Sequence, residues 1–206
     1  MLLAIDTSAG SGVAVVDETG LVRAERATDD TMRHAEAIGV LIAEALAAAG
    51  VDAADVDGVV AGVGPGPFTG LRVGIAAAHA FAFGAGCRML PVVSHDALAL
   101  AWYLEGGDGP LLVVTDARRR ERYWSSYEGL DLHGLPVRAG GPGLAKPHAL
   151  PETAGTRLDA HHVSAASLGM VAARTLAAGI AFAPDEPLYL RSPDVTPAAA
   201  PKRVSA

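Results

Sequence analysis

The sequence has little cysteine and little lysine, and each shortage excludes a class of site. Cys87 is the one cysteine among 206 residues, which rules out a disulfide framework and any zinc or iron–sulfur centre with several cysteine ligands. The only lysines are Lys146 and Lys202. Neither is near the Gly/Pro loop Gly62–Gly70 in the sequence, so this loop is not a Walker-type phosphate loop. A single cysteine fits a reducing compartment.

Long apolar runs and net positive charge are also missing. The best apolar run, residues 75–86, contains His79 and falls short of the ~18–20 residues that a membrane helix needs. The apolar residues 1–5 are not preceded by a basic region, so we expect no signal peptide. With a net charge of −7, the chain is not expected to be the main holder of a nucleic acid. We therefore expect a cytoplasmic protein outside the membrane.

Half of the residues are apolar, enough for one large domain or two lobes. Hydrophobic periodicity and turn residues predict the elements of the first hundred residues. In chain order these are strands at 2–5, 13–16 and 21–27, a helix over 38–49 that ends at Gly50, a strand at 59–63, a helix over 69–85 with Thr69 as N-cap, a strand at 89–93, and a helix that Ser94 caps. This βββαβαβα order requires a mixed sheet with helices on its faces.

A second unit begins after the glycine-rich stretch at 105–110. Strands are expected at 111–115 and 122–127 and a helix over 164–178, whereas the Gly- and Pro-rich residues 129–156 show no clear pattern. The Pro- and Ala-rich residues 192–206 have little to bury, and we expect them to be mobile. The predicted division is residues 1–104, 105–191 and a tail over 192–206.

The loop Gly62–Gly70 is the most unusual stretch. It joins a buried strand to a helix N-terminus and does not match GxGxxG in any register. A fixed structural role, a partner contact and anion binding are all open, in falling order of preference. Arg72 lies in the first helical turn, where a cation opposes the helix dipole, so we expect it to find a carboxylate in this chain or in a partner.

The segment Asp6-Thr7-Ser8 has two interpretations. Its carboxylate could hold a hydrated metal while the hydroxyl groups face a phosphate. Alternatively, Asp6 caps the turn of a hairpin, as aspartate often does. No second phosphate loop is evident, so we favour the cap.

The histidines do not form a metal or catalytic pattern. A helical metal pair would need a ligand three or four residues after His34, where Ala37 and Ile38 stand. His34 is therefore expected to be a buried or interface residue that makes hydrogen bonds. The consecutive Ser94-His95-Asp96 contains the residue types of a triad, but neighbours in sequence do not normally align as one.

Two clusters could contact other molecules. Arg118, Arg119 and Arg120 form the one dense basic cluster, which fits either a solvated turn or a contact with RNA or a partner. In the helix over 69–85, a face of small residues permits close helix packing. That face, made by Gly74, Ala77, Ala78 and Ala82 beside Phe81, is either core or an interface.

Several motifs occur together and in order. They are Leu3-Ala-Ile-Asp-Thr-Ser8, Arg33-His-Ala-Glu36, Gly64-Pro-Gly-Pro-Phe-Thr-Gly-Leu-Arg-Val-Gly74, Asp116-Ala-Arg118 with Glu121 and Tyr123, and Pro187-Leu-Tyr-Leu-Arg191. Over nearly the whole chain this pattern closely resembles the TsaB (YeaZ) family of tRNA threonylcarbamoyladenosine synthesis. The resemblance implies an α/β fold of the actin/Hsp70/sugar-kinase (ASKHA) type, with two RNase H-like lobes whose mixed sheets are flanked by helices.

The resemblance also implies a function. The chain would be an inactive relative of the transferase TsaD, whose metal-binding HxxxH motif is reduced here to His34 with Ile38. It would have no catalytic residues, metal or cofactor of its own. It would pair with a TsaD homologue through its two N-terminal helices, recruit a TsaE homologue, and form a homodimer when alone. Contact with tRNA would occur only within that complex, which transfers threonylcarbamoyl from threonylcarbamoyl-AMP to N6 of adenosine 37.

The residues implied for the partner interface lie on the two N-terminal helices. They are His34, Leu41, Ala45, Arg72, Gly74, Ala78, Phe81 and Ala82, with Arg118, Arg119 and Arg120 as a possible contact with RNA or a partner. Pro67 and Ala35 stand where the family usually has serine. Two rival functions are an independent ASKHA-type ATPase or small-molecule kinase and, less favoured, a metallopeptidase.

Overall fold

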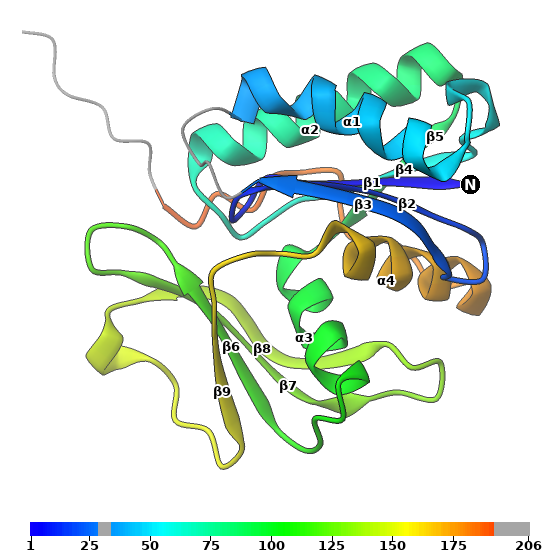
Figure 1. Cartoon of the computed structure of the whole chain (residues 1–206). Coiled ribbons are helices and arrows are strands. Elements are labelled where there is room, and N and C mark those ends of the chain that lie inside the picture. The colour runs from blue at the N-terminus through cyan, green and yellow to red at the C-terminus, as the bar shows by residue number, and fades with distance from the viewer. Residues whose placement is uncertain (29–33, 192–206) are drawn as a thin grey trace, which may run out of the picture.

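The computed structural model, which describes residues 1–28 and 34–191, contains two mixed β-sheets with helices between and above them (Figure 1). The first sheet has the strand order β3-β2-β1-β4-β5. Its strands are β1 (Leu2–Asp6), β2 (Ser11–Val16), β3 (Val22–Thr28), β4 (Gly58–Gly62) and β5 (Arg88–Val92). β1 pairs antiparallel with β2 and parallel with β4. The three strands β1, β2 and β4 are buried along their whole length, which is why their sequences are apolar without alternation.

Helices cover both faces of the first sheet. Figure 1 shows α1 (His34–Ala49) and α2 (Phe68–Ala85) side by side above it and α4 (Ala165–Ala178) below it. The side chains of α1 and α2 close one apolar core against β1, β2 and β4. A second core joins the lower face of this sheet to α3 (Ser94–Leu104), α4 and the other sheet.

The second sheet repeats the topology of the first. Its order is β8-β7-β6-β9, from β6 (Leu111–Asp116), β7 (Arg122–Leu130), β8 (Pro136–Ala145) and β9 (Thr156–Ala160). β6 pairs antiparallel with β7 and parallel with β9, as β1 does with β2 and β4. Only the short 3-10 turn Pro147–Ala149 stands where the first unit has α1. The two RNase H-like lobes confirm the predicted ASKHA fold class.

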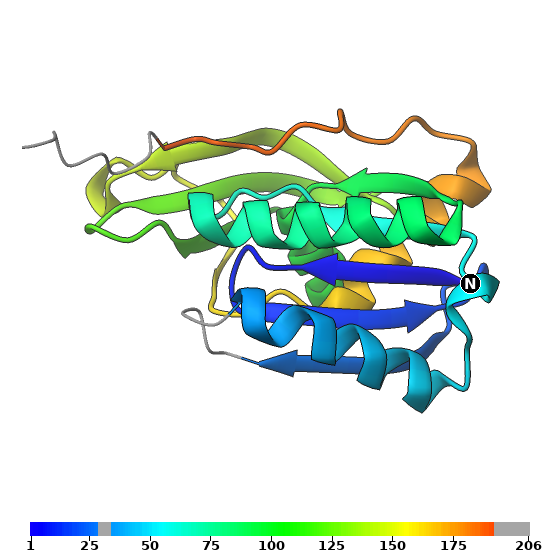
Figure 2. The same ribbon diagram turned by 90° about the horizontal axis from the view of Figure 1, so that it is seen from above.

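The chain crosses between the two sheets more than once. The helix α3 contacts β7 and β8 of the second sheet, whereas α4 contacts β1 and β2 of the first. After α4, residues 180–191 run back along α2 (Figure 2), and the Leu188 amide donates to the Val63 carbonyl at 2.8 Å. The division at residue 104 stays a prediction, and the predicted mobile tail over 192–206 lies outside the described residues.

Most predicted elements agree with the structure, but α1 begins at His34 instead of residue 38, and two predicted N-caps are wrong. Gly50 and Gly179 adopt φ of +65° directly after α1 and α4, as expected for helix-ending glycines. Thr69, however, lies inside α2, whose N-cap is Pro67. Ser94 is the first residue of α3 and does not cap it, because its hydroxyl group is directed at a carboxylate of the first sheet.

One expectation about apolar segments needs correction. By length and composition alone, α2 is apolar enough to cross a membrane, although no segment was expected to be. In the structure its inner side chains pack in the core of the first lobe. A core helix passes the same test of length and composition, so the finding is weak support for a membrane span.

Candidate functional site

The carboxyl group of Asp6 lies at the carboxyl end of β1, the edge where ligands of α/β sheets commonly bind. It is 2% exposed. Its Oδ1 accepts from the Ser8 amide at 2.8 Å and the Ser8 hydroxyl at 2.6 Å, and its Oδ2 accepts from the Ser94 hydroxyl at 2.5 Å. Burial raises the pKa of Asp6, and the hydrogen bonds from Ser8 and Ser94 oppose that rise. Both oxygens of the carboxyl group thus accept hydrogen bonds from the chain's own donors.

These contacts decide between the two interpretations of Asp6-Thr7-Ser8. The Ser8 amide donates to the Asp6 side chain two residues earlier, which is an Asx turn. Asp6 therefore caps the turn between β1 and β2, as favoured. Its hydrogen-bonded and buried oxygens do not fit a hydrated metal ion.

Two glycines of the Gly62–Gly70 loop fit tightly against this turn. A β-carbon added at Gly62 would overlap the Asp6 carboxylate, and one added at Gly66 would lie 2.8 Å from Ser8 Cα. From the second sheet, the Tyr123 hydroxyl donates to the Gly66 carbonyl at 3.1 Å. The loop is therefore held between the turn after β1 and the Tyr123 side chain of the second sheet.

Further along, Gly70 and Gly74 face Thr7. A β-carbon at Gly70 would lie 2.5 Å from the Thr7 carbonyl oxygen, and one at Gly74 would overlap the Thr7 hydroxyl. That hydroxyl donates to the Gly70 carbonyl at 2.7 Å. The glycines thus serve a close approach of α2 to β1, which is the structural role favoured for this loop.

His95 is completely buried between α3 and the second sheet. Its Nδ1 lies 2.8 Å from the Ser125 hydroxyl and its Nε2 lies 2.9 Å from the Thr115 hydroxyl. Burial, with a smaller contribution from the charge of Arg138, lowers the pKa of His95 to about 3. The imidazole is therefore neutral at physiological pH, and both of its nitrogens have hydroxyl partners.

The neighbours of His95 point elsewhere. Asp96 accepts from Arg138 Nε at 3.1 Å and from the Tyr127 hydroxyl at 2.7 Å, and Arg138 Nη2 completes a bidentate ion pair. Burial, followed by the charge of Asp96, raises the pKa of Tyr127 well above its ordinary value. The three consecutive side chains Ser94, His95 and Asp96 thus have separate partners, and the prediction that they form no triad is confirmed.

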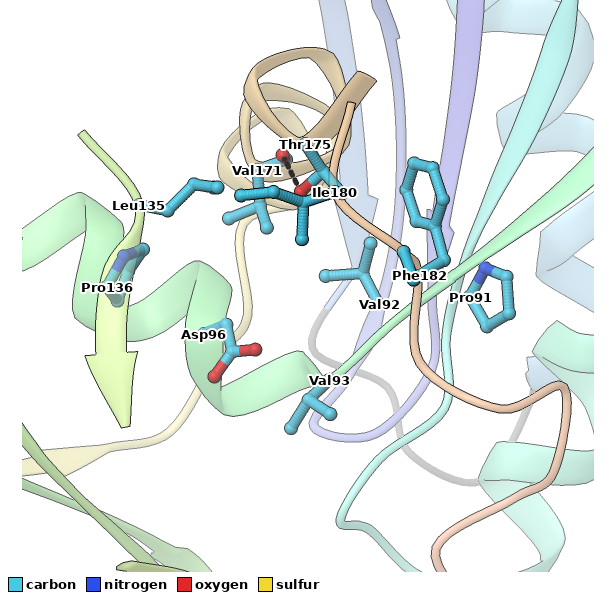
Figure 3. Close-up of a pocket in the computed structure, with 11 residues that line it drawn as sticks. Pro91, Val92, Val93, Asp96, Leu135, Pro136, Val171, Thr175, Ile180 and Phe182 are labelled. Carbon is cyan, nitrogen blue, oxygen red and sulfur yellow. Dashed lines mark hydrogen bonds between the residues drawn. The ribbon is translucent and has the colours of Figure 1, made fainter. Parts of the chain in front are cut away.

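A cavity of about 160 Å³ lies between α3, α4 and the first residues of β8 (Figure 3). Its lining is mostly apolar and consists of Pro91, Val92, Val93, Asp96, Leu135, Pro136, Val171, Thr175, Ile180, Ala181 and Phe182. The one charged side chain in this lining, Asp96, is already paired with Arg138. The cavity brings together no nucleophile and base.

His34 is buried, and its Nδ1 lies 2.7 Å from the Ser11 hydroxyl. Four residues later, Ile38 is packed in the apolar core and offers no ligand. The described residues contain no group of three histidine, cysteine, aspartate or glutamate side chains that could hold a metal ion. This part of the chain does not fit the metal site of the HxxxH pattern.

Most residues proposed for the partner interface need correction. Leu41, Ala45, Gly74, Ala78 and Ala82 are buried within this chain, because α1 and α2 turn their small side chains toward each other and the sheet. The stripe is therefore core, one of the two alternatives for the face of α2. His34 is likewise buried, whereas Phe81 is half-buried.

Arg72 is exposed and stacks on aromatic side chains. Its guanidinium carbon lies 3.9 Å from the centre of the Phe68 ring, and its Nε donates to the Tyr189 hydroxyl at 3.1 Å. Among the described residues its partners are aromatic side chains, and a carboxylate in a partner protein stays a prediction. The segment 180–191, which supplies Tyr189, was not predicted to pack along α2, and the only signal for it was the block Pro187–Arg191.

Comparisons with known proteins agree with this architecture. The model of the family described as TsaD, tRNA N6-adenosine threonylcarbamoyltransferase, matches residues 25–147. An uncharacterized protein of Mycobacterium tuberculosis is 43% identical over 96% of this chain and 95% of its own length. The tRNA threonylcarbamoyladenosine biosynthesis protein TsaB of Escherichia coli is 31% identical over 62% of this chain and 54% of its own.

A solved structure covers almost the whole fold. YeaZ from Pseudomonas aeruginosa superimposes with a TM-score of 0.77 at 28% identity, over 92% of this chain and 99% of that one. A Pseudomonas aeruginosa protein described as similar to peptidase YeaZ gives a TM-score of 0.80 with the same coverage. The chain belongs to the TsaD family, and within it to the TsaB/YeaZ group.

Proposed function

We propose that this chain is a non-catalytic subunit of tRNA threonylcarbamoyladenosine biosynthesis. In this role it pairs with a TsaD homologue and a TsaE homologue in the cytoplasm. The complex transfers threonylcarbamoyl from threonylcarbamoyl-AMP to N6 of adenosine 37 in tRNAs that read codons beginning with A. The names of the TsaB relatives from Escherichia coli and Haemophilus influenzae, which describe biosynthesis proteins, support this pathway.

The observation that supports the non-catalytic role is that the chain's own side chains and loop occupy the carboxyl end of β1. The Asp6 carboxylate is bound by Ser8 and Ser94, and the loop glycines leave no room for even a methyl group at Gly62 or Gly66. A phosphate or metal ion bound here would have to displace buried hydrogen bonds, each costing about 1–3 kcal/mol. This supports a scaffold and argues against the rival kinase and peptidase functions.

The outer faces of α1 and α2 are our candidate for the partner surface. They are exposed and rich in small and apolar residues: Ala35, Gly39, Val40, Ala43, Ala47 and Ala48 on α1, and Ala76, Ala80, Phe83 and Gly84 on α2. Val40 is 56% exposed and Phe83 is 92% exposed. Large exposed apolar side chains on neighbouring helices are typical of an interaction surface.

Phe83→Asp should abolish pairing with the TsaD homologue while leaving the melting temperature within about 2 °C of the original. A charge on a fully exposed position costs little stability, but it is strongly unfavourable inside an apolar interface. Size-exclusion chromatography of the mixed proteins measures the pairing. Leu132→Asp is the matched control, because Leu132 is 89% exposed on the turn between β7 and β8; equal loss in both variants contradicts this surface.

The proposed function is tested by depleting the protein and measuring threonylcarbamoyladenosine in bulk tRNA by mass spectrometry. We expect the nucleoside to fall severalfold and to return when the chain is re-expressed. The purified chain alone should transfer no threonylcarbamoyl group. Unchanged threonylcarbamoyladenosine levels after depletion, or robust threonylcarbamoyl transfer by the isolated chain, would contradict the proposal.

A further inference from the structure

The turn between β6 and β7 carries three arginines in an unfavourable backbone conformation. Arg118, Arg119 and Arg120 are exposed and have φ of +62°, +48° and +62°. Residues with a β-carbon rarely adopt this left-handed region, whereas glycine and asparagine do so readily. Three adjacent cations also repel one another. The turn could be made more easily by other residues, so a role for the arginines beyond turn formation is indicated.

We call residues Arg118–Arg120 the arginine turn. Hydrogen bonds hold the backbone of this turn in place. The Glu121 amide donates to the Arg118 carbonyl at 2.9 Å, and the Arg118 amide donates to the Asp116 carboxylate at 3.3 Å. Both neighbouring acids have cationic partners outside the turn. Asp116 pairs with Arg122, and Arg191 Nε lies 3.6 Å from Glu121 Oε2. The backbone of the turn is therefore fixed by hydrogen bonds, and both neighbouring acids are paired with arginines outside it.

Further positive charge lies at the same end of the second sheet. Arg122 pairs in register with Ala145, the last residue of β8, so Lys146 follows directly beside the turn. Both views show the β6–β7 turn and the short 3-10 turn after β8 projecting from one end of the molecule (Figures 1 and 2). This positive edge contrasts with the net charge of −7 for the whole chain.

We propose that the arginine turn binds the phosphodiester backbone of RNA, as a contact that supplements the main RNA-binding partner. The inference rests on the proposed function, which brings a tRNA to the complex. Guanidinium groups match phosphate oxygens in a bidentate geometry. An acidic protein surface is less favoured, because stable protein interfaces need apolar anchors, and no exposed large hydrophobic residue lies in the described residues 117–121 or 146–149.

The test compares the full chain with a variant that carries Arg118→Asn, Arg119→Asn and Arg120→Asn. Asparagine tolerates positive φ, so this variant should melt at the same temperature or higher. A variant with Arg26→Gln, Arg88→Gln and Arg157→Gln removes equal charge from exposed sites elsewhere. The probe is a fluorescent, unmodified tRNA transcript that reads a codon beginning with A, and anisotropy gives its Kd from 50 to 200 mM KCl.

We expect the asparagine variant to bind about tenfold more weakly at 50 mM KCl. Its slope of log K against log salt should fall in magnitude by about 2, because each phosphate contact contributes ~0.7–0.9. The glutamine control should lose less than twofold. The proposal is overturned if the full chain binds no tRNA at 50 mM KCl, if both variants weaken equally, or if the asparagine variant binds as the original does.

Two further outcomes separate the possible explanations. If the asparagine variant keeps its tRNA affinity but no longer pairs with the TsaD homologue, the turn contacts protein and the RNA proposal is wrong. The proposed function is judged separately, by threonylcarbamoyladenosine in depleted cells. Because tRNA binding requires no transfer chemistry, either proposal can fail while the other stands.

Discussion

Lowering the pH from 7 to 4.5 should remove about 2.5 kcal/mol of unfolding free energy through His95 alone, and His95→Gln should abolish this loss. In the folded state the pKa of His95 is about 3, whereas an unfolded histidine titrates near 6.5. Between these values the unfolded chain binds a proton that the folded chain does not. Stability therefore falls as the pH drops through this window, at about 1.4 kcal/mol per pH unit.

Urea unfolding at pH 7, 5.5 and 4.5 measures this effect as a difference between two curves. Glutamine can still donate to and accept from the Thr115 and Ser125 hydroxyls, so His95→Gln should cost about 1–2 kcal/mol at pH 7. Below pH 5 the variant should become the more stable protein. His79→Gln is the comparison, since His79 is half-exposed on α2 and lies 3.2 Å from Asp185, so it shows what the loss of a solvent-accessible histidine does. Parallel curves for His95→Gln and the original would contradict the assignment.

The first lobe could be predicted almost element by element because its signals are local. The apolar residues of β1 and β4 are bounded by Asp6 and by Gly62, and helical spacing marks α1 and α2. The repeated βββαβ order then restricted the topology to a mixed sheet. These signals need no knowledge of distant contacts.

The strands β8 and β9 could not be predicted for the opposite reason. β8 contains Gly140, Gly141 and Gly143, residues that are depleted in strands, and it forms by pairing with β7 along a register that shifts repeatedly. β9 becomes a strand by adding to β6 in parallel. In both cases, pairing with a strand that is distant in sequence outweighs the low strand propensity of the local residues.

In the candidate site, too, local contacts could be predicted from the sequence, whereas contacts between distant residues could not. The Asx turn of Asp6 and Ser8 spans two residues and was predicted, whereas the bond from Ser94 joins residues 88 positions apart and left no local signal. As a result Ser94 was assigned to the N-cap of α3. The small residues of α2 were recognised, but only the packing of α1 against α2 decides that they are core.

Gly70→Ala should destabilise the protein by about 1–2 kcal/mol, whereas Gly84→Ala in the same helix should stabilise it by up to about 1 kcal/mol. Alanine has the higher helix propensity at both positions, by ~0.8–1 kcal/mol. A β-carbon at Gly84 meets nothing within 4 Å, but one at Gly70 lies 2.5 Å from the Thr7 carbonyl oxygen. That oxygen is backbone and cannot rotate away, so α2 or the turn after β1 has to move.

The cost at Gly70 exceeds the gain in helix propensity because the movement spreads into buried contacts. Thr7 is 1% exposed and its hydroxyl donates to the Gly70 carbonyl, while the next turn residue, Ser8, holds the Asp6 carboxylate. Overpacking of this kind costs ~1–3 kcal/mol, occasionally more. Urea unfolding of both alanine variants measures the opposite signs directly. Equal stabilisation by the two substitutions would show that α2 does not approach β1 as closely as Thr7 and Gly70 indicate, and the structural role of the loop glycines would then fail.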